Sequence, residues 1–218
     1  MPLKNDRDEQ VSGLVAAAGN DSFGMLFKIV VFTGLRLAEA LGLTWDCVDF
    51  TKQRITVSKQ LQKRPIAEGG FVFAPLKNDK IRVIAPAPFV MDLLSERQRL
   101  QTQDRDAVGD AWLGWANEKE RQTALVFTNE LGQHLHPQTA LNHFKKLAAS
   151  VGAPDARIHD LRHTFAVLSL QNGDDVKTVQ GNLGHATAAF TLDVYGHVSE
   201  RMKDDSAKRM QQYIEELK

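Results

Sequence analysis

Residues 157–165 are RIHDLRHTF, which places His159, Arg162 and His163 within little more than one helical turn. On a helix, His159 shares a face with Arg162, three positions on, and with His163, four positions on. Such a cluster has three possible interpretations: half of a zinc site, a phosphate-binding site, or an ordinary polar helix face. The rest of the chain has to decide among these interpretations.

The zinc interpretation is the weakest of the three. HDLRH resembles the HExxH helix of metalloproteases, but Asp replaces the Glu that acts as general base there. A third ligand would be needed, and an arginine on the same helical face would repel a dication. The single cysteine, Cys47, can form no internal disulfide and anchor no cysteine-rich metal site. We therefore expect neither a metal nor a cofactor.

The composition is that of an ordinary globular protein, with 218 residues of which 43% are hydrophobic and 25% are charged. Its 27 basic residues balance 27 acidic ones, so the charge gives no hint of a polyanionic partner. No segment approaches the roughly 18 apolar residues of a membrane span, and the first residues lack a signal-peptide pattern. The low cysteine content favours a reducing, cytoplasmic location.

Helical spacing dominates the chain on both sides of a short β-rich region. The stretches RITVSKQL, GFVFAPL and KIRVIAP are β-branched and bounded by turn residues, which predicts a three-stranded antiparallel meander. The turn KNDK would join the last two strands. The fold class expected is α+β, mainly helical, with helices at 8–18, 23–34, 35–43, 89–104, 137–150, 159–172, 174–183, 187–195 and 199–217. Residues 105–121 are expected to form a surface loop or short helix, and 124–133 an isolated strand or an extended segment.

A second basic position lies in TGLRLAEALGLTW, residues 33–45. Arg36 follows a glycine and begins a helix, where its guanidinium and the helix N–H groups can approach a phosphate together. Glu39, one turn on, is suited to hold Arg36 or another basic residue in position. The alternative is an exposed Arg–Glu pair worth a few tenths of a kcal/mol. Farther along, residues 182–198, NLGHATAAFTLDVYGHV, carry His185 after a glycine and then Tyr195.

TGLRLAEALGL, HDLRHTFA and LGHATAAFTLDVYGHV, in that order, resemble the signature segments of the tyrosine recombinase (phage integrase) family. The resemblance covers about residues 3–200 and is nearest to the integrases of conjugative transposons and phages. It implies that family's catalytic-domain fold. The family order of Arg, turn Lys, His-x-x-Arg, His and Tyr is matched by Arg36, Lys77, His159, Arg162, His185 and Tyr195.

What this resemblance implies is cleavage and rejoining of DNA strands without metal or nucleotide. Arg36 and Arg162 would clamp the nonbridging oxygens of one phosphodiester, because paired arginine N–H donors suit them and stay charged at any relevant pH. His159 and His185 would donate hydrogen bonds to the same oxygens, and His159 would help to remove the proton of the nucleophile.

Tyr195 is the nucleophile that the family pattern implies, forming a 3′-phosphotyrosyl bond and releasing a 5′-hydroxyl. A lysine on a mobile turn suits the general acid that protonates the leaving oxygen. Lys77 matches the family position, and Lys80, at the other end of the same turn, is its competitor. Lys80, His163, Lys59 and Lys63 are the expected DNA contacts.

The expected domain organisation is a catalytic domain over 1–198 and an amphipathic C-terminal tail over 199–218, suited to exchange between protomers. The family's N-terminal core-binding and arm-binding domains are expected to be absent from this chain. The implied partners are double-stranded DNA, further copies of the chain in a tetrameric synapse, and accessory DNA-bending or directionality factors. The chain alone is expected to be a monomer.

Two alternatives to a recombinase remain. One is a nicking–closing enzyme like the type IB topoisomerases, which shares the chemistry but needs a single DNA site. The other is a catalytically inactive DNA-binding regulator.

Overall fold

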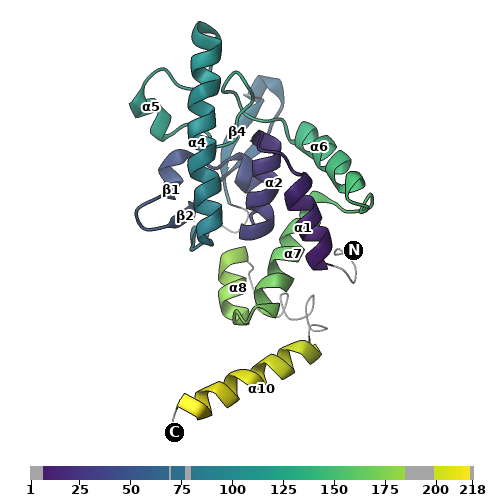
Figure 1. The fold of residues 1–218 in the computed structure, drawn as a ribbon. Coiled ribbons are helices and arrows are strands. Elements are labelled where there is room, and N and C mark those ends of the chain that lie inside the picture. The colour runs from purple at the N-terminus through teal and green to yellow at the C-terminus, as the bar shows by residue number, and fades with distance from the viewer. Residues whose placement is uncertain (1–6, 69, 77–79, 185–198, 217–218) are drawn as a thin grey trace.

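The structure is a computed structural model that describes residues 7–68, 70–76, 80–184 and 199–216 (Figure 1). Helices make up most of it, as the sequence predicts. The α-helices are α1 (Arg7–Ala17), α2 (Ser22–Thr33), α3 (Leu37–Leu41), α4 (Pro88–Val108), α5 (Glu118–Gln122), α6 (Pro137–Ser150), α7 (Ile158–Gln171), α8 (Val176–Leu183) and α10 (Ser199–Glu216). The expected helix at 187–195 lies outside the described residues.

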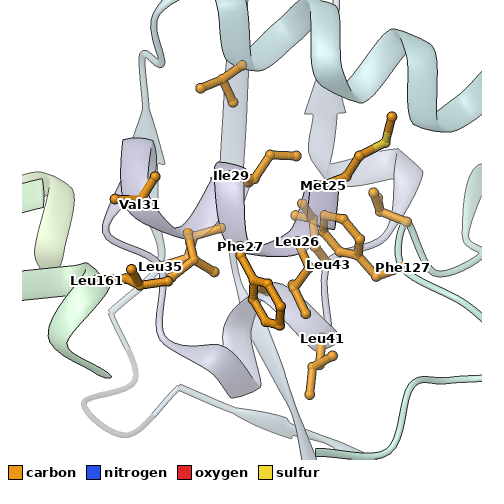
Figure 2. Packing of buried hydrophobic residues seen from close by; sticks show 14 of the residues in the cluster. Met25, Leu26, Phe27, Ile29, Val31, Leu35, Leu41, Leu43, Phe127 and Leu161 are labelled. Atoms are coloured by element: carbon orange, nitrogen blue, oxygen red, sulfur yellow. The ribbon is translucent and has the colours of Figure 1, made fainter. Parts of the chain in front are cut away.

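Helix α2 occupies the centre of the main core. The Asp21 carboxylate accepts a hydrogen bond from the Gly24 amide at 2.7 Å and caps its first turn. Nearly every residue from Gly24 to Thr33 is buried, as expected for a helix that is apolar on all sides. Figure 2 shows Phe27, Ile29 and other α2 side chains packed among residues from the segments around it, Leu161 of α7 included.

The strands form two small antiparallel sheets, and the predicted single meander is wrong. One sheet has the order β1-β2-β5, and the other pairs β3 with β4. The stretch RITVSKQL divides into two strands, of which the first pairs with KIRVIAP and the second with GFVFAPL. The strands are β1 (Val48–Asp49), β2 (Arg54–Val57), β3 (Lys59–Lys63), β4 (Phe71–Pro75) and β5 (Arg82–Ile84).

Burial explains this division. Ile55, Val57 and Ile84 are at most 2% exposed and belong to the main core, so β2 and β5 pair where both have an inward apolar face. The β3–β4 ribbon has one residue buried within its strands, Leu61, and its remaining side chains are partly or fully accessible. The chain therefore leaves the core-facing sheet after Val57 and returns to it at Arg82.

The region between α4 and α6 differs in detail from the prediction. Helix α4 continues to Val108, and Trp112 and Trp115 follow it with ring centroids 4.7 Å apart. Residues 124–133, expected to be an isolated strand or an extended segment, form no strand, and two single bridges join Leu125 to Thr44 and Thr128 to His134. Within the described ranges, no helix combines the length and apolar content that a membrane span requires.

The C-terminal helices complete the fold. Helix α7 packs against α2, and α8 packs against α7 through a second small apolar cluster that includes Val167, Val179 and Leu183. Helix α10 lies apart from these helices in Figure 1. Its residues 206–216 are exposed, with Met210, Tyr213 and Ile214 on the surface.

Candidate functional site

Arg162 links three parts of the chain that are far apart in sequence. Its side chain rises from the first turns of α7 and the residue is only 3% exposed. One guanidinium nitrogen donates to the Gly34 carbonyl at 2.5 Å, and the other terminal nitrogen donates to the Leu183 carbonyl. The ends of α2 and α8 are therefore both held at Arg162, and these ends directly precede Arg36 and His185.

Gly34 allows this arrangement. It ends α2 in the left-handed conformation, with φ at 67°. A Cβ atom at this position would lie 2.5 Å from a ring carbon of Phe165 and 2.6 Å from a methyl carbon of Leu183. The close approach of α2, α7 and α8 at this point therefore requires glycine for both its conformation and its size.

Arg36 lies just beyond this junction, at the N-terminus of α3. Its guanidinium donates to one Glu39 carboxylate oxygen at 2.7 Å, and its backbone amide donates to the other at 2.9 Å. The Arg36 side chain is 28% exposed, whereas that of Glu39 is 1% exposed. The buried Glu39 carboxylate thus orients the Arg36 guanidinium, which remains accessible to a ligand.

His159 lies within the electrostatic field of both arginines. Partial desolvation lowers the pKa of its imidazole below 6.5, and the charges of Arg162, Arg157 and Arg36 lower the pKa further, against the opposing charge of Asp160. The ring packs edge-on against His163, with centroids 4.9 Å apart. His159 is therefore neutral at pH 7, so it can accept a proton as well as donate a hydrogen bond.

Asp160 has a structural role in the first turn of α7. It is 2% exposed, and its carboxylate accepts from the Arg157 amide and from the Arg157 guanidinium, both at 2.9 Å. This repeats the arrangement of Arg36 with Glu39 at α3. In the zinc interpretation Asp160 would take the place of the metalloprotease base, but here its carboxylate caps the helix and pairs with an arginine.

Arg82 on β5 is bound to Glu39 of the candidate site and is absent from the residues predicted from the sequence. Its side chain is 8% exposed and donates to both Glu39 oxygens, at 3.1 and 2.6 Å. Its Nε also donates to the Asn182 carbonyl, near the end of α8, at 2.8 Å. The sequence signal was present, because strand alternation places residue 82 on the same face as the buried Ile84. A charged residue on an inward face needs a partner.

The carboxylate of Glu39 is the common acceptor for both arginines. Burial alone would raise its pKa, but the hydrogen bond and charge of Arg82, and then the hydrogen bonds of Arg36, lower that pKa below 4.5. Glu39 is therefore ionised at neutral pH.

The remaining predicted positions divide into two groups. The predicted site residues that lie outside the described residues are Lys77, His185 and Tyr195. Of the predicted DNA contacts, Lys80 and Lys63 are exposed, and Lys59 lies 4.8 Å from the ring centre of Phe73 and 4.0 Å from Asp46. His163 is partly buried beside His159.

The fold is that of tyrosine recombinase catalytic domains. It is similar to the Tn1549 transposon integrase solved with a circular intermediate DNA, with a TM-score of 0.72 and 19% identity, over 96% of this chain and 66% of that one. It is also similar to the catalytic domain of bacteriophage HP1 integrase, with a TM-score of 0.58 and 19% identity over 95% of this chain and 94% of that one.

A model of the phage integrase family matches residues 7–202, and the chain belongs to that family. It is 28% identical to a XerC-like tyrosine recombinase of Caldanaerobacter subterraneus over 93% of this chain and 52% of the relative. It is 25% identical to the ICEBs1 integrase of Bacillus subtilis over 95% of this chain and 54% of the relative. The chain thus spans about half the length of these curated relatives.

Proposed function

We propose that this chain is the catalytic domain of a site-specific DNA recombinase that cleaves and rejoins strands through a phosphotyrosine bond at Tyr195. One observation carries the proposal. The buried guanidinium of Arg162 binds the carbonyls of Gly34 and Leu183, which brings the segments preceding Arg36 and His185 together. The segment that begins α7 therefore meets the described residues that come just before Arg36 and His185, which supports the proposal.

The two arginines suit the charge that develops during the reaction. Attack on a phosphodiester crowds the phosphorus and increases the negative charge on its nonbridging oxygens. Arg36 is accessible and oriented by Glu39, and Arg162 is buried, with its guanidinium fixed by the carbonyls of Gly34 and Leu183. Preorganised donors of this kind are usually the largest single contribution to catalysis of such reactions.

The proposed chemistry needs one base and one acid. A free phenol has a pKa of about 10, so forming phenolate at pH 7 costs roughly 4 kcal/mol, which a cationic site can offset. Neutral His159 accepts the proton as the Tyr195 oxygen bonds to phosphorus and the bond from phosphorus to the 5′-oxygen breaks. Lys77 gives a proton to that oxygen. A 5′-hydroxyl of another strand reverses the step, which makes the outcome recombination rather than hydrolysis.

The same proposal extends to partners and location. Double-stranded DNA is the substrate, four copies assemble on two sites, and accessory DNA-bending or directionality factors adjust the outcome in the cytoplasm. The relatives support the DNA substrate, because they include a tyrosine recombinase and a transposon integrase solved in complex with DNA. With equal numbers of acidic and basic residues, the chain alone should bind DNA weakly and with strong salt dependence.

Covalent capture tests the proposal. The chain is mixed at low salt with a pool of duplexes of randomised central sequence, each nicked so that cleavage releases a short strand that cannot religate. We expect a protein–DNA adduct that survives denaturing electrophoresis and is lost in Tyr195→Phe, with the captured DNA revealing the target. An adduct in Tyr195→Phe, or none with the native chain, contradicts the proposal. Relaxation of supercoiled DNA that carries one site would instead favour the nicking–closing alternative.

A further inference from the structure

Arg82 lies outside the three segments that carry the resemblance, TGLRLAEALGL, HDLRHTFA and LGHATAAFTLDVYGHV. It is the first residue of β5 and lies two residues after Lys80, where the described chain resumes. Its side chain crosses from the sheet to the helical part of the site. All three nitrogens of its guanidinium donate hydrogen bonds to residues of other elements.

With the two hydrogen bonds from Arg82, the buried carboxylate of Glu39 accepts four hydrogen bonds in all. One oxygen accepts from the guanidinium groups of Arg36 and Arg82, and the other accepts from the Arg36 amide and from Arg82. A carboxylate has about four acceptor sites, so this set leaves Glu39 little freedom to rotate. Because Glu39 also orients Arg36, Arg82 restrains Arg36 through it.

The contact with α8 restrains the opposite side of the site. Arg82 Nε donates to the Asn182 carbonyl. A Cβ atom at Gly184 would lie 3.2 Å from the Arg82 side chain, so the arginine lies directly against the residue that precedes His185. The Arg82 side chain therefore ties β5 to the end of α8 directly and to Arg36 through Glu39.

We propose that Arg82 is a positioning residue for strand cleavage, which holds Arg36, through Glu39, and the end of α8 in their reactive places. This inference rests on the proposed function. Arg82 acts through other residues and need not touch the phosphate. Lysine at this position would keep the charge but lose the planar fork that reaches two oxygens and a carbonyl together.

The test compares Arg82→Lys and Arg82→Gln with Arg54→Gln as the matched control. Arg54 lies on the neighbouring strand β2, is exposed, and donates to two backbone carbonyls of the adjoining turn. Single-turnover cleavage is measured on the nicked duplex selected by covalent capture. We expect Arg82→Lys to be slowed about 10- to 100-fold with DNA affinity unchanged, because small misplacements of reacting groups have effects of this size. Arg82→Gln is slowed further, and Arg54→Gln is unaffected.

Two further measurements identify the route of the effect. The double variant Arg36→Lys with Arg82→Lys should be slowed by less than the product of the two single effects, since Arg82 acts in part through Arg36. A substrate with sulfur in place of the leaving 5′-oxygen needs no general acid and should not rescue Arg82→Lys. Native cleavage rates in Arg82→Lys, multiplicative losses in the double variant, or rescue by sulfur would each overturn the inference.

Amide hydrogen exchange without DNA keeps this inference separate from the proposed function. In Arg82→Lys and Arg82→Gln we expect faster exchange at the amides of Arg36 and Gly184, which donate to Glu39 and to Gly181, and unchanged exchange in α6. A native chain that forms no adduct would refute the recombinase proposal, while exchange would still decide whether Arg82 anchors the site. Unchanged exchange at both amides would refute the anchoring itself.

Discussion

Replacing Gly34 by alanine tests the junction of α2, α7 and α8 most directly. The left-handed conformation at φ 67° costs a residue with a Cβ roughly 1–2 kcal/mol. The added methyl group would lie 2.5 Å from Phe165 and 2.6 Å from Leu183, far inside contact distance, and such overpacking costs about 1–3 kcal/mol. The variant should therefore lose about 2–5 kcal/mol of the free energy of unfolding, out of the roughly 5–15 kcal/mol usual for a domain.

Gly152→Ala is the matched control for this variant. Gly152 also has a positive φ, 76°, but a Cβ there would meet nothing within 4 Å, so only the conformational cost applies. Equilibrium unfolding in urea, followed by circular dichroism, should show a larger fall in midpoint for Gly34→Ala, by about 0.3–1 M if the m-value is about 3 kcal/mol/M. Equal shifts in the two variants would refute the close packing of Phe165 and Leu183 around Gly34.

The other predictions concern charge and proton transfer. Glu39→Gln leaves a buried arginine without its carboxylate and should lower the free energy of unfolding by about 3–5 kcal/mol at pH 7. Because the pKa of Glu39 is lowered in the fold, its contribution is present above pH 4.5 and disappears on acidification, so this variant should lose stability less steeply below pH 4.5 than the native chain. In NMR titrations, His159 should have a midpoint below 6.5, and Arg162→Gln should move it upward; an unchanged midpoint would contradict the assigned cause. Lys77→Ala should slow cleavage about 10²- to 10⁴-fold and be rescued by sulfur at the leaving position, while Lys80→Ala should have little effect; the reverse pattern would make Lys80 the acid.

Local pattern was sufficient for most helices. The predicted range 137–150 matches α6, and 159–172 differs from α7 by one residue at each end, because helical spacing and capping residues are encoded within a few positions. The order of Arg36, the His159–Arg162 pair, His185 and Tyr195 likewise indicated the family, since a series of residue types along the chain is a property of sequence. The catalytic roles stay predictions for all six residues, Arg36, Lys77, His159, Arg162, His185 and Tyr195.

The pairing of the strands and the partners of Arg82 could be found only in the tertiary structure. The three β-rich stretches were recognised, but which of them pair depends on the apolar surface that α2 and its neighbours present to Ile55, Val57 and Ile84. No local pattern encodes that surface.

The sequence by itself therefore determined the family, most of the helices and the residue types available for chemistry. Only the tertiary structure shows that Glu39 accepts hydrogen bonds from both Arg36 and Arg82. It also shows that Arg162 binds backbone carbonyls 128 and 21 positions away in the sequence. The physical reason is that a buried charge is stable only when it is paired with opposite charge or hydrogen-bonded. Its partners are the groups that lie close to it in space, which need not be close in the sequence.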